Sequence, residues 1–240
     1  MVAGQVRVDA TSEKLLQLDE VDNVNRKSYQ EMSNIDRERL EILARLKAHS
    51  ALLAEYFSRL GQLAESKAAS DASASTNSIT ASLNQIGKQL RGSPLLANAS
   101  IPGMIAGKAL EAKASGLLKR ELQEHAQLIR EEIATQEAML SVLSKDVQQD
   151  LKVIGEARER RLVIVPLTSE AKIDKASEWA AARQSILTGS SLPQELSQAS
   201  AAARELRTAF EALAGGGKAE SVEALQFRMR ALGNQVEMLR

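Results

Sequence analysis

Two histidines are the side chains of this sequence best suited to acid–base or metal chemistry. His49 and His125 both fall on the apolar stripes of strongly periodic segments, an unexpected place for a polar residue. If the two segments pair antiparallel, His49 lies opposite residue 122, within one helical turn of His125. We therefore predict a buried, pH-sensitive pair of imidazoles. The alternative is that each ring bonds separately to a neighbouring side chain or to water.

The residues around the histidines do not form a known metal or catalytic motif. Bundles that bind two iron ions place glutamate three residues before histidine, but Leu46 and Leu122 stand there. Cysteine is absent, which excludes disulfides, thiolate nucleophiles and cysteine-ligated zinc. No serine lies in a Gly-x-Ser-x-Gly setting. We expect no enzyme, no metal and no cofactor, and keep a small-ligand or metal-binding bundle as an alternative.

The glycine run 215–217, followed by Lys218, has part of the pattern of a phosphate-binding loop. That motif needs glycine at the place of Ala212 and serine or threonine at the place of Ala219. No strand is predicted before the run, and glycine is common just past the end of a helix. We interpret the run as a turn between helices.

The segment 94–107 has the glycines and prolines of a loop but is unusually apolar. Five of its residues could form an exposed patch that contacts a protein partner or a membrane: Leu95, Leu96, Ile101, Met104 and Ile105. Charged residues follow closely, so we expect shallow membrane contact rather than a spanning helix. The alternative is that these side chains cap the end of the bundle core.

The elements that must position these residues are long amphipathic helices. Apolar residues recur every three or four positions over 32–63 and 118–165, which is the seam spacing of a coiled coil. Arg39 and Gln136 interrupt these stripes, and they either set the register or mark places where the bundle opens to solvent. The apolar run 162–165 has no second strand to pair with, so we interpret it as the tail of a helix.

We predict an all-α, elongated antiparallel helical bundle with two long helices, about 11–69 and 102–165, and several shorter ones. Residues 1–10 are predicted as a frayed arm, and 70–78 as a break, because serine, aspartate and asparagine favour turns. The shorter helices are predicted at 79–90, 169–188, 192–213 and 222–239.

The composition is that of a folded protein with no excess of either charge. Lysine plus arginine number 31 and aspartate plus glutamate number 31, so a role in coating nucleic acid is disfavoured. We expect a single domain over 1–240 acting as a non-enzymatic scaffold, spacer or adaptor, through a protein partner or self-association. A membrane-active, pore-forming-like protein using the 94–107 tip is an alternative. The lack of cysteine is compatible with the exported, periplasmic part of an envelope protein, and a leader or lipid anchor before residue 1 is left open.

Overall fold

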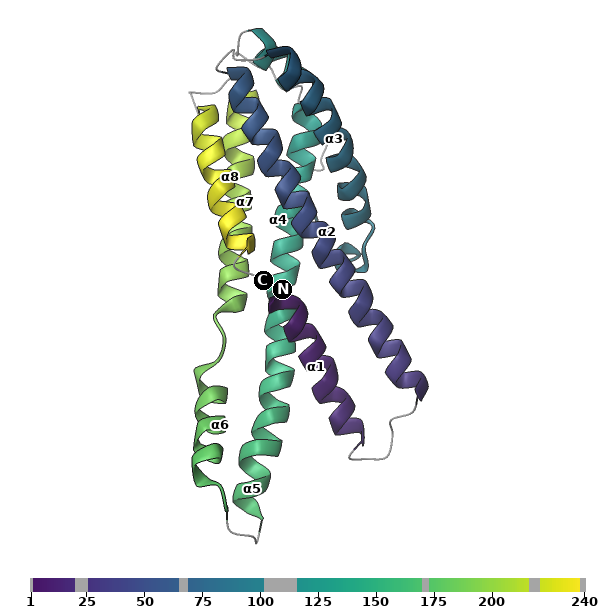
Figure 1. The fold of residues 1–240 in the computed structure, drawn as a ribbon, viewed down its shortest axis with the longest axis vertical. Helices are drawn as coiled ribbons and strands as arrows, with labels where there is room; N and C mark the ends of the chain where they lie inside the picture. The colour runs from purple at the N-terminus through teal and green to yellow at the C-terminus, as the bar shows by residue number, and fades with distance from the viewer. Residues whose placement is uncertain are drawn as a thin grey trace. The chain divides into compact units, whose positions relative to one another are not determined.

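The computed structural model describes residues 2–19, 26–64, 69–101, 116–169, 173–215 and 221–237. Within these ranges it contains helices and no strand, which confirms the predicted all-α bundle (Figure 1). In chain order the elements are α1 (Val2–Asp19), α2 (Arg26–Ala64), α3 (Ala69–Arg91), the 3-10 turn η1 (Pro94–Leu96), α4 (Gly116–Arg158), the π-helical η2 (Glu159–Ile164), α5 (Val165–Thr168), α6 (Ala176–Thr188), α7 (Leu192–Ala214) and α8 (Val222–Glu237).

The chain forms two compact units. Unit 1 comprises Met1–Glu41 and Ser144–Gln194, and unit 2 comprises Ile42–Leu143 and Glu195–Arg240. Both long helices, α2 and α4, contribute one part to each unit. The single domain expected over 1–240 stays a prediction.

The central long helix is confirmed. α4, η2 and α5 follow one another without a break over 53 residues, so the run 162–165 is helical and not a strand. Proline in a helix clashes with the carbonyl four residues before it. The wider π turn precedes Pro166, and in it Val165 N–H bonds to Arg160 O, five residues back. The predicted start at residue 102 lies outside the described residues.

The sequence predicted the other long helix as one continuous element over 11–69, and this prediction is wrong. Thr11 Oγ1 of α1 donates to Asp36 Oδ1 of α2 over 2.9 Å. In one straight helix these residues would lie about 38 Å apart, at about 1.5 Å per residue. α1 therefore lies back against α2, and the long helix is α2 alone, 39 residues.

The prediction of a frayed arm over 1–10 is wrong. α1 begins at Val2, and Ala3, Gly4 and Ala10 are buried in it. Thr11 and Glu13 are the other buried residues of α1, so the helix lacks the large apolar side chains by which a helix is usually recognised. Small residues allow close approach between helices, which explains how such a face can pack.

The predicted break at 70–78 is also wrong, since α3 runs from Ala69 to Arg91. Further along this helix Thr80 Oγ1 donates to Asn77 O over 3.1 Å, a local bond of a kind that a helix tolerates. α6 begins at Ala176, later than residue 169. The predicted helices 192–213 and 222–239 correspond to α7 and α8.

Unit 2 has a core of large apolar side chains from all of its helices. In this core the ring of Phe57 on α2 meets two others edge to face: the Tyr56 ring at a centroid distance of 5.6 Å and the Phe210 ring of α7 at 5.9 Å. Other fully buried side chains of the unit are the leucines and isoleucines Leu53, Leu60, Leu83, Leu122, Ile129, Ile133 and Leu206. Such edge-to-face pairs add to the stabilisation from burial.

Unit 1 has a much thinner core. Its large buried apolar residues, among those described, are Val147, Ile154, Val163 and Leu192. Ion pairs fix α1: Arg7 contacts Asp36 of α2 at 3.3 Å and Asp150 of α4 at 2.9 Å. Burial raises the pKa of Asp150, and Arg7 opposes that shift.

The packing of α1 can be tested with Ala10, which is fully buried, and Ser12, which is exposed on the same helix. Overpacking a buried site costs about 1–3 kcal/mol. We expect Ala10→Leu to lower the free energy of unfolding by that amount and Ser12→Leu to leave it nearly unchanged, as measured by urea denaturation followed by circular dichroism. Equal effects of the two substitutions would show that α1 does not pack as described.

Candidate functional site

His49 of α2 is fully buried in unit 2, where its ring faces α4. Its Nδ1 is 2.9 Å from Gln136 Oε1, and its Nε2 is 2.9 Å from Glu132 Oε2. Gln136 Nε2 donates to Ser50 Oγ over 2.8 Å. His49 therefore faces residues 132 and 136 of α4, so the register that would place it opposite residue 122 is wrong. Gln136 is fully buried and helps to set the observed register.

Both ring nitrogens of His49 face oxygen acceptors in this arrangement. A ring that donates from both nitrogens is an imidazolium, because the neutral ring has one donor and one acceptor. If the Gln136 amide is turned over, its nitrogen faces Nδ1 and its oxygen accepts from Ser50. The donor or acceptor role of His49 Nδ1 therefore depends on the orientation of the Gln136 amide.

The Glu132 carboxylate receives donors from two other helices. Besides His49 of α2, Arg91 of α3 donates to Glu132 Oε1 over 3.0 Å and to Thr135 Oγ1 over 2.9 Å. A Cβ added at Gly87 of α3 would lie 1.8 Å from Glu132 Oε2, so the carboxylate occupies the space that this glycine leaves open. We call His49, Ser50, Arg91, Glu132, Thr135 and Gln136 the Glu132 network.

A second buried carboxyl group, Glu121 of α4, lies beside Tyr56 of α2. Thr76 Oγ1 donates to Glu121 Oε2 over 3.0 Å. The described residues supply no hydrogen bond of ordinary geometry to Glu121 Oε1 or to the Tyr56 hydroxyl. Burial raises the pKa of Glu121, against the opposing effect of His125. Burial also raises the pKa of Tyr56 well above its ordinary value, and the Glu121 charge raises it further.

His125 bonds to a different partner from His49. Its Nε2 is 2.9 Å from Asn77 Oδ1 of α3, and its side chain is 15% exposed. The two rings thus have separate hydrogen-bond partners, and their role as a pH-sensitive pair stays a prediction. Because Tyr56 lies beside Glu121 while His49 lies beside Glu132, α2 and α4 run antiparallel in unit 2, as expected.

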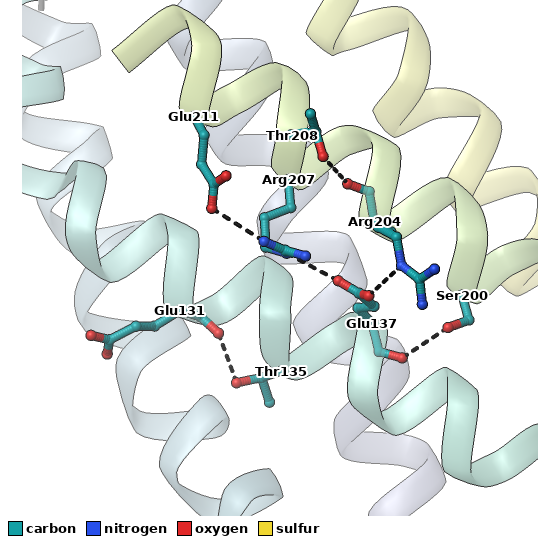
Figure 2. Close-up of polar contacts among 8 residues, drawn as sticks. All are labelled: Glu131, Thr135, Glu137, Ser200, Arg204, Arg207, Thr208 and Glu211. Carbon is teal, nitrogen blue, oxygen red and sulfur yellow. Dashed lines mark hydrogen bonds and ion pairs between the residues drawn. The ribbon is translucent and has the colours of Figure 1, made fainter. Parts of the chain in front are cut away.

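Figure 2 shows a third buried carboxylate, Glu137 of α4, which faces α7. Arg204 Nε donates to one carboxylate oxygen over 2.8 Å and Arg207 Nε to the other over 3.0 Å. Ser200 Oγ donates to the Glu137 carbonyl over 3.1 Å. Burial lowers the pKa of Arg207, but the bonds to Glu137 and Glu211 outweigh it, and the net shift is upward. Glu137 thus joins α4 to α7 with both oxygens occupied.

Across the described ranges, no three His, Asp or Glu side chains are placed to hold one metal ion. The glycine run lies at the end of α7, where Gly215 N donates to Glu211 O over 2.8 Å. Residues 216–218 lie outside the described residues.

The predicted apolar tip is covered in part. Leu96 of η1 is buried, while Leu95 and Ile101 are half-buried. Met104 and Ile105 lie outside the described residues, so contact of the tip with a partner or membrane stays a prediction. None of the helices that the structure describes is both long and apolar enough to span a membrane.

Unit 1 exposes an apolar surface that the sequence did not single out. Leu162, Ile164, Val165 and Leu167 of η2 and α5 are 39, 46, 52 and 60% exposed. The four residues lie within a stretch of six positions, two in η2 and two in α5. We call them the η2–α5 surface. In the sequence, the signal for such a surface was the unbroken apolar run 162–165. Consecutive apolar residues lie all around a helix, and a neighbouring helix can bury only one side of it.

Two grooves flank the η2–α5 surface. One of about 270 Å³ is lined by Leu16 of α1 together with Ala157, Arg160 and Val165. The other, of about 360 Å³, is lined by Leu162, Pro166, Ile173 and Trp179. Hollows of this kind beside exposed apolar side chains can accept the side chains of a partner.

α6 lies beside η2 and has little apolar support of its own. Trp179 Nε1 donates to Val163 O over 3.1 Å, which attaches the helix. No residue of α6 or of α5 is buried, and Leu187 is 65% exposed. An isolated helix of 13 residues is marginal in water, so further contacts would stabilise α6.

Comparisons with protein families, with curated proteins and with solved structures give no match for this chain.

Gly87 tests how tightly the Glu132 network fits. Alanine is usually better than glycine inside a helix by about 0.5–1 kcal/mol. At Gly87 the new Cβ would overlap a carboxylate that cannot move without losing its bonds to His49 and Arg91. We expect Gly87→Ala to lower the free energy of unfolding by more than about 1 kcal/mol in urea denaturation. Gly233→Ala, where a Cβ meets nothing within 4 Å, is the control and should be neutral or stabilising.

Glu121 predicts a dependence of stability on pH. Its pKa is raised in the folded protein, so the folded state holds a proton that the unfolded state releases. Stability is therefore present at low pH and is lost as pH rises from the ordinary glutamate pKa to the raised one. Glutamine imitates the protonated acid, so we expect the stability of Glu121→Gln relative to the native chain to rise across that interval. Parallel pH profiles of unfolding for the two proteins would contradict this.

Proposed function

We propose that this chain is a non-enzymatic helical adaptor and that its η2–α5 surface binds a protein partner. One observation carries the proposal. Unit 1 buries few large apolar side chains, yet most of the exposed large apolar side chains in the described part of the chain belong to it. They are Val2, Leu16, Tyr29, Ile35, Leu162, Ile164, Val165, Leu167 and Leu187, whereas unit 2 exposes Leu117 and Phe227. Grouped exposed apolar residues are typical of interaction sites.

The two grooves support a protein partner over a lipid surface. Large apolar side chains set into pockets supply much of the affinity of protein interfaces. Arg160 lines the first groove and has no hydrogen-bond or ion-pair partner among the described residues, whereas Arg158 and Arg161 both contact Glu13 at 3.1 Å. We infer a partner that presents an amphipathic helix with large apolar side chains and a carboxylate facing Arg160.

Photo-crosslinking can identify the partner. A photoreactive residue placed at Val165 is compared with one at Ile35, since both positions belong to unit 1 and both are 52% exposed. We expect a specific protein adduct from Val165 alone, identified by mass spectrometry in cells that express the chain. Lipid adducts from Val165, or the same adducts from both positions, would overturn the proposal, the first in favour of a membrane-active protein.

Binding by the purified partner tests the surface directly. We expect Leu167→Asp to weaken binding at least tenfold, about 1.4 kcal/mol, because it places a charge in an apolar contact. Ile35→Asp carries the same change at an exposed site outside the surface and should bind as the native chain does. Isothermal titration calorimetry gives both dissociation constants, and equal values would exclude the η2–α5 surface as the binding site.

A further inference from the structure

Unit 2 carries a separate groove of about 400 Å³ between α7 and α8. Its lining residues are Ala202, Glu205, Ala224, Phe227, Arg228 and Ala231. Three of them are alanines, and their small side chains leave the hollow open. Phe227, beside them, is 73% exposed, more than any other large hydrophobic residue that the structure describes.

The groove has the features of a self-complementary surface. Ala224, Phe227 and Ala231 follow one another at steps of three and four on α8, the spacing of a helix–helix seam. Within this seam a large side chain stands between two small ones. If a second α8 lies antiparallel to the first and is displaced by one turn, each phenylalanine faces an alanine of the other copy.

The charges at the groove have the same complementarity. Arg228 Nη1 of α8 is 3.2 Å from Glu205 Oε2 of α7, and both side chains are accessible, at 35 and 69%. The groove thus has an anion on one helix and a cation on the other. A two-fold rotation brings Glu205 of one copy toward Arg228 of the second, so like charges are not forced together.

We propose that a second copy of this chain occupies the groove, with Phe227 of each copy inserted against the alanines of the other. One groove and one exposed aromatic side chain per copy make a limited contact, so we expect a reversible dimer populated at high concentration. This dimer goes beyond the proposed adaptor function, because it uses unit 2 and none of the η2–α5 surface.

Sedimentation velocity of the full chain over a wide concentration range tests the dimer. We expect the native chain to pass from monomer to dimer, and Phe227→Ala to weaken dimerisation at least about tenfold with unchanged circular dichroism. Leu167→Asp changes the η2–α5 surface and not the groove, so this variant should dimerise as the native chain does. Loss of partner binding and loss of dimerisation can therefore be told apart. A native chain that stays monomeric, as it would if a different protein fills the groove, or dimerisation that survives Phe227→Ala, would overturn the proposal.

Charge reversal gives a sharper test. Glu205→Arg makes the groove wholly cationic and Arg228→Glu makes it wholly anionic, so each variant alone should dimerise less than the native chain. When the two variants are mixed, residue 205 of each copy meets a residue 228 of opposite charge on the other copy. The mixture should therefore form heterodimers. Native mass spectrometry distinguishes these species because the two variants differ in mass. A mixture without heterodimers would show that the charges do not meet across two copies.

Discussion

The buried charge of Glu132 is the constraint on which the arrangement of unit 2 depends. A carboxylate with no exposure is stable only where donors and cations reach it. Here they come from His49 on α2 and Arg91 on α3, while Gly87 must stay without a side chain. Breaking a buried pair leaves an uncompensated charge and typically costs about 3–5 kcal/mol. Apolar stripes that repeat every turn can pack in several registers of α2, α3 and α4. The observed register is the one that places His49 and Arg91 beside Glu132.

The other helices of unit 2 follow the same plan of an apolar core with one polar connection. α7 is joined to α4 through Glu137, whose oxygens meet two arginines. α8 is joined to α2 through Gln226, whose side-chain nitrogen donates to Phe57 O over 3.1 Å and fills the space beside Gly61. Leucine and alanine supply the burial that stabilises the unit, and the polar contacts select the pairing. In unit 1 ion pairs are present but the burial of large apolar side chains is scarce, and this scarcity is what motivates the proposed binding surface.

Periodicity predicted most of the helices because a helix packed on one side must repeat its apolar residues every three or four positions. It missed the first part of α1, where the buried residues are Ala3, Gly4 and Ala10, and the first part of α3, whose serines and threonines suggest a turn. The register of α2 on α4 could not follow from leucine stripes that fit in several registers. His49 and Gln136 on those stripes were the available signal, since polar residues in a core need partners. Which acid would meet His49 depends on packing that a single sequence does not specify.

The exposed surface of unit 1 has a physical origin in the backbone. On α4 the buried stripe passes through Val147, Asp150, Ile154 and Ala157, and in a continuous α-helix it would next reach residues 161 and 164. The π turn of η2 holds one more residue than an α-helical turn, and the side chains after it rotate away from that stripe. Val163 takes the buried place, where its carbonyl meets Trp179, while Ile164 and Val165 turn to solvent. A rare type of turn thus exposes part of an apolar run that a regular helix would have buried. π turns of this kind often occur at functional sites, which is consistent with placing partner binding at this end of the central helix.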